Sequence, residues 1–249
     1  MRNPATRWIV YDPCFESSRR SARRGKSPQR TVRTMSLPDE LQRIFDADRA
    51  LRNAESVLLR NKSSKELIAL LEHETENAIQ MEDRNEGVVR LERLADLCAQ
   101  VPGPRMTDAL IAILNDGEPR VRVAAGEALR DLGYERYAEV ARGIERALDR
   151  SADGLAMCEL PWVLAEIAEP SALPLIRRFL DHPSSDVAAA AIEALAQLRD
   201  PDSVRDLERF IGDSRVVIIE DFEDEAKTTL GELAEDALEM LGVTPSAGD

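Results

Sequence analysis

Hydrophobic residues recur along most of this chain at the three- and four-residue spacing of amphipathic helices. Residues 107–133 contain two such helices joined by a short loop that leads into Pro119, and residues 171–200 repeat this pattern. Because one helical pair cannot bury its own apolar stripe, successive pairs must stack into a solenoid. Two columns of matched residues share one period: Leu110, Ile144, Leu175 and Leu207 in first helices, and Leu97, Leu129, Leu164 and Leu195 in second helices.

The same period organises most of the chain into helical pairs. We predict four repeats in residues 104–242, preceded in residues 35–103 by a divergent first repeat and by one helix, residues 37–59, that caps the stack. No long alternation of apolar and polar residues predicts strands, and aromatic residues make up only 4% of the chain, which is low for a sheet protein. The sequence therefore predicts an all-α, right-handed α-solenoid of about five helical pairs, with a disordered C-terminus at residues 243–249.

Glycine, proline and one long connection predict how individual helices end. Gly133 and Gly242 each follow a leucine at a predicted helix end, where a left-handed residue ends a helix at little cost. Pro161 lies well inside a predicted helix, which should therefore bend or start again there. Residues 212–225 form a longer connection in the last repeat, and we interpret its apolar run, residues 216–219, as an extension packed across the open end of the stack.

The pattern Leu-x-x-x-Leu-Asn-Asp-x-x-Pro-x-Val-Arg-x-x-Ala-x-x-Ala-Leu-x-x-Leu-Gly, at residues 110–133, resembles a HEAT repeat of the short kind also found in phycobilisome lyases. In such repeats Asp116 and Arg122 would form a ladder between neighbouring units, so the resemblance implies that their role is structural. The later repeat has Asp181 but holds Ala188 where the arginine would stand, so the ladder is interrupted there. The resemblance also implies a chromophore-lyase activity as one alternative, although a fold does not fix a function.

The charges separate an acidic body from a basic beginning. The formal net charge is −14, yet residues 1–34 hold nine Arg or Lys and only two Asp or Glu. Three interpretations of this segment stay open: a disordered tail or upstream extension with Met35 as the true first residue, a targeting segment, or a tail that binds nucleic acid. An acidic solenoid repels phosphates, so we expect nucleic acid only at residues 1–34. No apolar run approaches the ~18 residues of a membrane span, and we expect no membrane partner.

Cysteine and histidine are too few and too scattered to predict a catalytic site. Cys14, Cys98 and Cys158 form no short-spaced pair, which favours a reducing compartment and a cytoplasmic location. His73 and His182 are the only histidines, and they cannot supply a metal-ligand set by themselves. We therefore expect no catalytic residue, no metal and no cofactor. An enzyme or enzyme subunit of the HEAT-like lyase or hydroxylase type remains the alternative.

The solvent side of the second helices is the candidate binding surface. When these helices are aligned on their leucine column, Glu127, Trp162 and Glu193 fall in line, with Glu166 one turn beyond Trp162. A tryptophan between carboxylates could anchor a basic or amphipathic segment of a partner protein, because aromatic residues concentrate interface energy. Trp162 could equally fill space beside Pro161. Phe222, within an acidic cluster, is a further candidate contact. We predict a non-catalytic protein-interaction scaffold or adaptor that binds its partner on the concave face of the solenoid.

Overall fold

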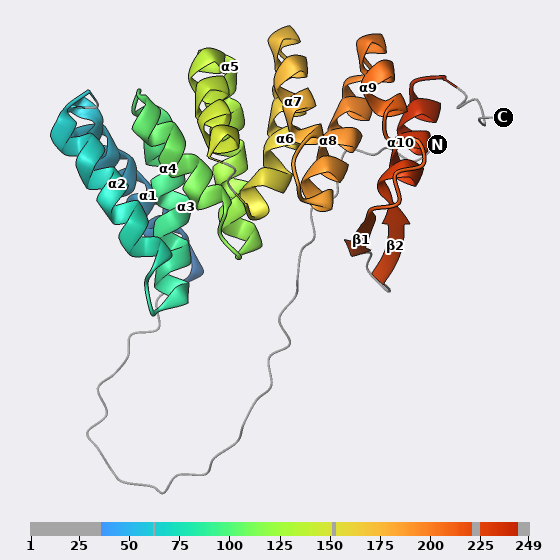
Figure 1. Ribbon diagram of the computed structural model, residues 1–249. Coiled ribbons are helices and arrows are strands. Elements are labelled where there is room, and N and C mark those ends of the chain that lie inside the picture. Colours follow the sequence, from blue (N-terminus) through green and yellow to red (C-terminus); the bar gives the residue numbers. More distant parts are fainter. Residues whose placement is uncertain (1–35, 62, 151–152, 221–224, 244–249) are drawn as a thin grey trace, which may run out of the picture. The chain divides into compact units, whose positions relative to one another are not determined.

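The computed structural model describes residues 36–61, 63–150, 153–220 and 225–243 (Figure 1). The chain divides into two units, residues 1–47 and residues 48–249, and the second contains the repeats. The segments predicted to be disordered, residues 1–34 and the C-terminus after Val243, lie outside the described residues. Within the described part of the chain, no helix is long and apolar enough to cross a membrane.

The helices of the second unit follow one another as pairs, as predicted for an all-α solenoid. The first members are α2 (Lys65–Ile79), α4 (Pro104–Leu114), the second half of α5 (Pro119–Asp149), α7 (Leu173–Leu180) and α9 (Val204–Glu208). The second members are α3 (Arg84–Gln100), the first half of α5, α6 (Leu155–Ile167), α8 (Ser185–Leu198) and α10 (Leu230–Met240). Short 3-10 turns, η1 (Leu59–Asn61), η2 (Pro170–Ala172) and η3 (Pro201–Ser203), precede α2, α7 and α9.

The core of the second unit runs through all of these pairs. All eight residues of the two predicted apolar columns are buried, and they belong to one continuous hydrophobic cluster. The second helices contact one another in the order α3, α5, α6, α8 and α10. Each pair therefore covers the apolar stripe of its neighbours, which is how a helical repeat becomes stable.

The prediction that Gly133 ends a helix is wrong. Gly133 lies inside α5, and the break between the two halves of this helix comes at Arg136, whose φ of −140° and ψ of 50° are not helical. A β-carbon on Gly133 would lie 2.3 Å from Cδ1 of Ile167, so the glycine allows α5 and α6 to approach closely. Gly242, by contrast, has a φ of 78° directly after Leu241, as expected for a residue that ends a helix.

Pro161 does not restart its helix. The helix α6 extends without interruption from Leu155 to Ile167, with Pro161 buried inside it. The proline ring removes the hydrogen bond that an N–H at this position would donate to the carbonyl of Met157. The surrounding apolar residues of α6, most of which are buried, hold the helix together despite this loss.

A β-hairpin interrupts the last repeat, where the sequence predicted no strand. The strands β1 (Val216–Glu220) and β2 (Glu225–Thr229) pair antiparallel, with Val216 opposite Thr229. Val217 is buried, and the hydroxyl of Ser185 in α8 donates a hydrogen bond to the carbonyl of Val216 at 3.1 Å. Since β1 contacts α8 and β2 contacts α10, the predicted extension packs on the last two second helices as a hairpin.

The helix α1 (Leu37–Leu58) forms over almost all of the residues predicted for the capping helix. None of its residues is buried, and its large apolar side chains are exposed. Its role as a cap for the stack stays a prediction.

Candidate partner-binding surface

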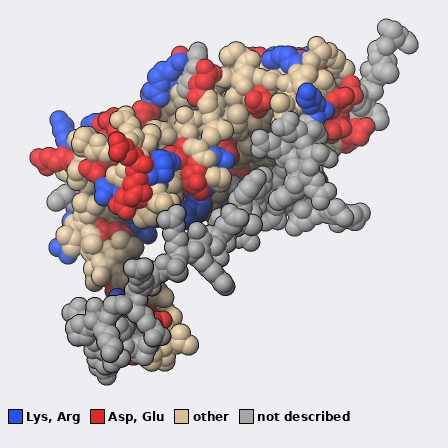
Figure 2. All heavy atoms as spheres, turned by 90° about the horizontal axis from the view of Figure 1, so that it is seen from below, with Lys and Arg blue, Asp and Glu red and all other residues tan. Residues whose placement is uncertain are grey.

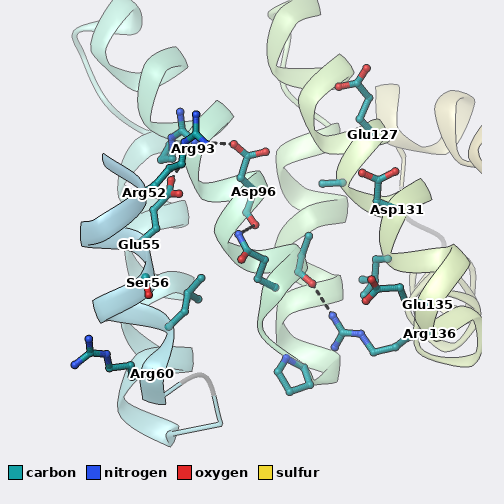
Figure 3. Close-up of a pocket in the computed structure, with 16 residues that line it drawn as sticks. Arg52, Glu55, Ser56, Arg60, Arg93, Asp96, Glu127, Asp131, Glu135 and Arg136 are labelled. Atoms are coloured by element: carbon teal, nitrogen blue, oxygen red, sulfur yellow. Dashed lines mark hydrogen bonds and ion pairs between the residues drawn. The ribbon is translucent and has the colours of Figure 1, made fainter. Parts of the chain in front are cut away.

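An open groove of about 980 Å³ lies among the end of α1, the helix α3 and the first half of α5. Every residue that lines it belongs to the unit formed by residues 48–249. Figure 3 shows charged side chains from all three helices around this space, with those of α5 across from those of α1. Small or apolar side chains, among them Leu59, Ala99, Ala128 and Leu132, line the rest of the groove. The groove thus combines a charged rim with apolar surface.

The wall formed by α5 is acidic. Glu127, Asp131 and Glu135 are spaced by four residues, which places them on one side of the helix, and all three are exposed. Leu129 and Leu132 of α5 are buried, and this burial fixes which side of the helix faces the groove. Asp131 lies 3.8 Å from the guanidinium of Arg130. Among the described residues, neither Glu127 nor Glu135 has an arginine or lysine nitrogen within ion-pair distance.

The opposite wall is largely neutralised by its own ion pairs. Arg93 of α3 lies 3.1 Å from Glu55 of α1 and 3.0 Å from Asp96, so one guanidinium joins two carboxylates and two helices. Burial raises the pKa of the Asp96 carboxyl, and Arg93 partly offsets this rise. On the α5 side, Arg136 donates to the carbonyl of Ala99 and to the carboxylate of Glu139. The carboxylates that remain available to a ligand are therefore mainly those of α5.

The structure places the predicted strip along consecutive second helices but does not gather it into one cavity. Glu127 lines the groove, whereas Trp162 in α6 and Glu193 in α8 do not. Trp162 is half-buried, and so is Glu193. Glu166 forms an ion pair with Arg130 at 3.2 Å. Phe222 lies outside the described residues.

Sequence reasoning missed most of the groove. Asp131 and Glu135 extend the line begun by Glu127, and their four-residue spacing was a signal that could have identified them. Glu55 and Asp96 could not have been found in this way, because only the packing of the chain brings α1 and α3 to the same groove.

The predicted ladder between repeats is present in a modified form. Asp116 is buried and its carboxylate lies 2.7 Å from Arg84 of the preceding repeat. Arg122 donates to the backbone carbonyls of Asp116 and Gly117 and reaches Glu159 of the following repeat at 3.4 Å. These contacts link three successive repeats, which agrees with the structural role that the family resemblance implies.

The assignment of Asp181 to the ladder position is wrong by one residue. The buried residue at the place of Asp116 is His182, whereas Asp181 is exposed and pairs with Arg209 at 3.1 Å. Asp181 was assigned to this position because, in both repeats, an acidic or amide residue directly follows the leucine before the loop.

The two described cysteines lie in environments that suppress their reactivity. Burial raises the pKa of Cys98 to about 12 and that of Cys158 to about 11, which keeps both thiols protonated at neutral pH and poor as nucleophiles. His73 is exposed, and His182 is buried in a different repeat. Within the described ranges, no group of three or more His, Cys, Asp or Glu residues could hold a metal ion.

Comparison with known proteins supports the repeat assignment. Residues 144–220 match the family model for HEAT repeats. No curated protein matches the chain. The matched segment begins at residue 144, near the end of α5, and continues through α6, α7, α8 and α9 to β1, so it covers the middle and later repeats of the solenoid. Similarity to the phycobilisome-lyase type is not part of this match and stays a prediction. Residues 144–220, about a third of the chain, are thus similar to HEAT repeats.

Proposed function

We propose that this protein is a non-catalytic scaffold or adaptor that binds a partner protein through the second helices of its solenoid. The observation that carries the proposal is the groove beside α5, with three exposed carboxylates on one side of one helix. HEAT repeats commonly mediate contacts between proteins, and the match at residues 144–220 supports the same role here.

The partner segment that fits this surface best is basic and amphipathic. Consecutive carboxylates on α5 are about 6 Å apart along the helix axis, since each residue rises ~1.5 Å. Lysine or arginine residues spaced by four on a partner helix would meet Glu127, Asp131 and Glu135 in turn. The apolar side of the same helix would cover Leu59 and Ala99, which are only partly buried at the groove. Exposed charges of this kind chiefly steer association and select partners, whereas the apolar contact supplies affinity.

Trp162 extends the proposed surface to the next second helix. Its half-buried indole is suited to be held by its own helix while one part of the ring contacts a partner. Glu193 occupies the equivalent place on α8, and Glu166 stands one turn beyond Trp162. Phe222 would add a contact from the last repeat.

Two further assignments accompany this proposal. A cytoplasmic location is supported by Cys98 and Cys158, which are both free thiols. Residues 1–34 would not contribute to this binding surface, because their sequence does not contain the repeat pattern.

Affinity capture with the full chain tests the proposed function. The unchanged protein is compared with a variant in which Glu127→Gln, Asp131→Asn and Glu135→Gln remove the three charges. A partner retained by the unchanged protein and lost from the variant supports the scaffold. Elemental analysis of the same samples checks the enzyme alternative. One equivalent of iron or zinc per chain, lost on His73→Ala, would overturn the scaffold proposal in favour of an enzyme.

A further inference from the structure

Tyr134, close to the end of the first half of α5, exposes a large aromatic side chain. It is 61% exposed, yet its hydroxyl donates a hydrogen bond to the backbone carbonyl of Glu166 in α6 at 3.2 Å. The ring is therefore tied at one end to the next second helix, while much of its surface stays open to solvent. An aromatic side chain that is already held in place loses little conformational entropy when a partner contacts it.

Two carboxylates of α5 lie close to this ring along the helix. Tyr134 follows Glu127 by seven residues, which is about two helical turns, and it directly precedes Glu135. Both glutamates are exposed and line the groove. Arg130, one turn before Tyr134, forms an ion pair with Glu166 at 3.2 Å, so its positive charge is balanced. The ring thus lies beside carboxylates that are available to a partner.

The helices α5 and α6 are joined at this place by two contacts. The hydrogen bond from Tyr134 and the ion pair between Arg130 and Glu166 both connect one helix to the other. Trp162 lies four residues before Glu166, on the same side of α6. The proposed surface therefore continues from the groove beside α5 to α6 over Tyr134.

A cationic side chain is the contact that suits an exposed ring beside carboxylates. The face of an aromatic ring is the negative part of its quadrupole, so it attracts a guanidinium or ammonium group within ~6 Å of its centre. Arginine suits the site best, because its planar guanidinium stacks on a ring and still donates to a carboxylate at its edge. Figure 2 shows acidic and basic side chains intermixed on the described part of one face, so charge alone does not single out one position there.

We propose that Tyr134 is a binding residue of the partner surface, and that an arginine of the partner segment stacks on its ring. This role rests on the proposed function, because the stacked arginine belongs to the basic amphipathic segment that binds beside α5. The remaining basic residues of the segment meet Glu127, Asp131 and Glu135. Part of the preference for arginine over lysine then depends on the ring.

Fluorescence anisotropy with two labelled peptides measures this contact in the full chain. One amphipathic peptide carries arginines at positions i, i+4 and i+8 and leucines on its other side, and the second carries lysines in place of the arginines. The test variant is Tyr134→Leu, which keeps an apolar side chain and removes the ring. The control is Val89→Ala in α3, since Val89 is 57% exposed and does not line the groove.

We expect Tyr134→Leu to raise the Kd of the arginine peptide about fivefold and that of the lysine peptide less than about twofold, because the ring stacks mainly with a guanidinium. Tyr134→Phe keeps the ring and removes only its hydrogen bond to Glu166, so the Kd of the arginine peptide should rise less than about threefold. The Val89 control should leave both Kd values unchanged. Urea unfolding of each variant checks that it is folded.

The variant Glu127→Gln, Asp131→Asn and Glu135→Gln separates the role of Tyr134 from the proposed function. If this variant weakens binding of the arginine peptide while Tyr134→Leu leaves that Kd unchanged, the role of Tyr134 is overturned and the proposed function stands. Equal weakening of both peptides by Tyr134→Leu overturns the stacked arginine. Binding that does not depend on the α5 carboxylates, or no binding of either peptide, overturns both proposals.

Discussion

The carboxylate of Asp116 and the imidazole of His182 perform the same hydrogen-bonding role in two different repeats. Oδ1 of Asp116 accepts from the backbone N–H of Glu118 at 2.9 Å, and Nδ1 of His182 accepts from the backbone N–H of Ser184 at 3.2 Å. Both side chains are buried in the loop between the first and second helix of their repeat. The repeats therefore conserve a hydrogen-bond acceptor at this place rather than one residue type.

This equivalence predicts the effect of two substitutions at His182. His182→Ala removes the acceptor and leaves the N–H of Ser184 without its partner, which should destabilise the protein by about 1–3 kcal/mol. His182→Asn retains a neutral side-chain oxygen near the position of Nδ1 and should recover most of this loss. Urea unfolding of the two variants measures the difference. Equal losses of stability would show that the packing of the ring, and not the hydrogen bond, stabilises the loop.

A second prediction concerns the contact between α5 and α6. Gly133→Ala would place a β-carbon 2.3 Å from Cδ1 and 2.9 Å from Cγ1 of the buried Ile167, so the Ile167 side chain or one of the helices must shift. We expect a loss of about 1–3 kcal/mol in the free energy of unfolding. Gly126→Ala is the control, since the nearest atom to its β-carbon would be 3.8 Å away. Matching stabilities for the two variants would contradict the close approach of the helices.

The raised pKa values of the thiols predict slow alkylation. Cys98 and Cys158 have pKa values of about 12 and about 11, so at pH 8 a much smaller fraction is thiolate than in a free cysteine, whose pKa is ~8.5. Because only the thiolate reacts, iodoacetamide should modify Cys158 roughly 100-fold and Cys98 roughly 1,000-fold more slowly than after denaturation. The rate should increase as the pH rises toward 11. Mass spectrometry of peptides locates each product, and rapid modification of Cys98 in the folded protein at pH 8 is the contrary result.

The half-buried state of Trp162 predicts a divided effect of its substitution. Trp162→Ala should lower stability by less than the ~3–5 kcal/mol typical of a fully buried aromatic residue. It should weaken partner capture by ~2 kcal/mol or more if the exposed part of the indole is an anchor. Chemical denaturation beside the binding assay separates these effects. Full-strength binding by the folded variant would remove Trp162 from the proposed surface.

The residues that repeat with the helical period were predictable because burial selects them independently of distant contacts. All members of the columns through Leu129 and Leu110 are buried, and the number of helical pairs followed from their spacing. Local exceptions were harder to predict. Gly133 has the sequence context of a helix end, but its lack of a side chain serves contact with Ile167, which no local pattern reveals.

The hairpin and the groove were missed for the same reason. The strand β1 is only five residues long, so its alternation of buried Val217 with exposed Val216 and Ile218 is too brief to separate from an apolar loop. The groove depends on the placement of α1 beside α3, joined by the ion pair between Glu55 and Arg93. These two residues are 38 positions apart in the sequence, and no periodic pattern indicates that they are in contact.

Fluorescence anisotropy with a labelled amphipathic peptide tests the proposed function most directly. The peptide carries arginines at positions i, i+4 and i+8 on one side and leucines on the other. It is titrated with the full chain and with the variant Glu127→Gln, Asp131→Asn and Glu135→Gln. The control variant carries Glu235→Gln, Asp236→Asn and Glu239→Gln in α10, where the same three charges are removed from exposed residues.

We predict that neutralising the α5 carboxylates raises the Kd of the peptide about tenfold or more and flattens its salt dependence, because a local electrostatic contact is lost. The α10 control should change the Kd by less than about twofold. If both variants weaken binding equally, the peptide responds only to the overall negative charge. That result, or an unchanged Kd in the α5 variant, would contradict the assignment of the groove as the partner-binding surface.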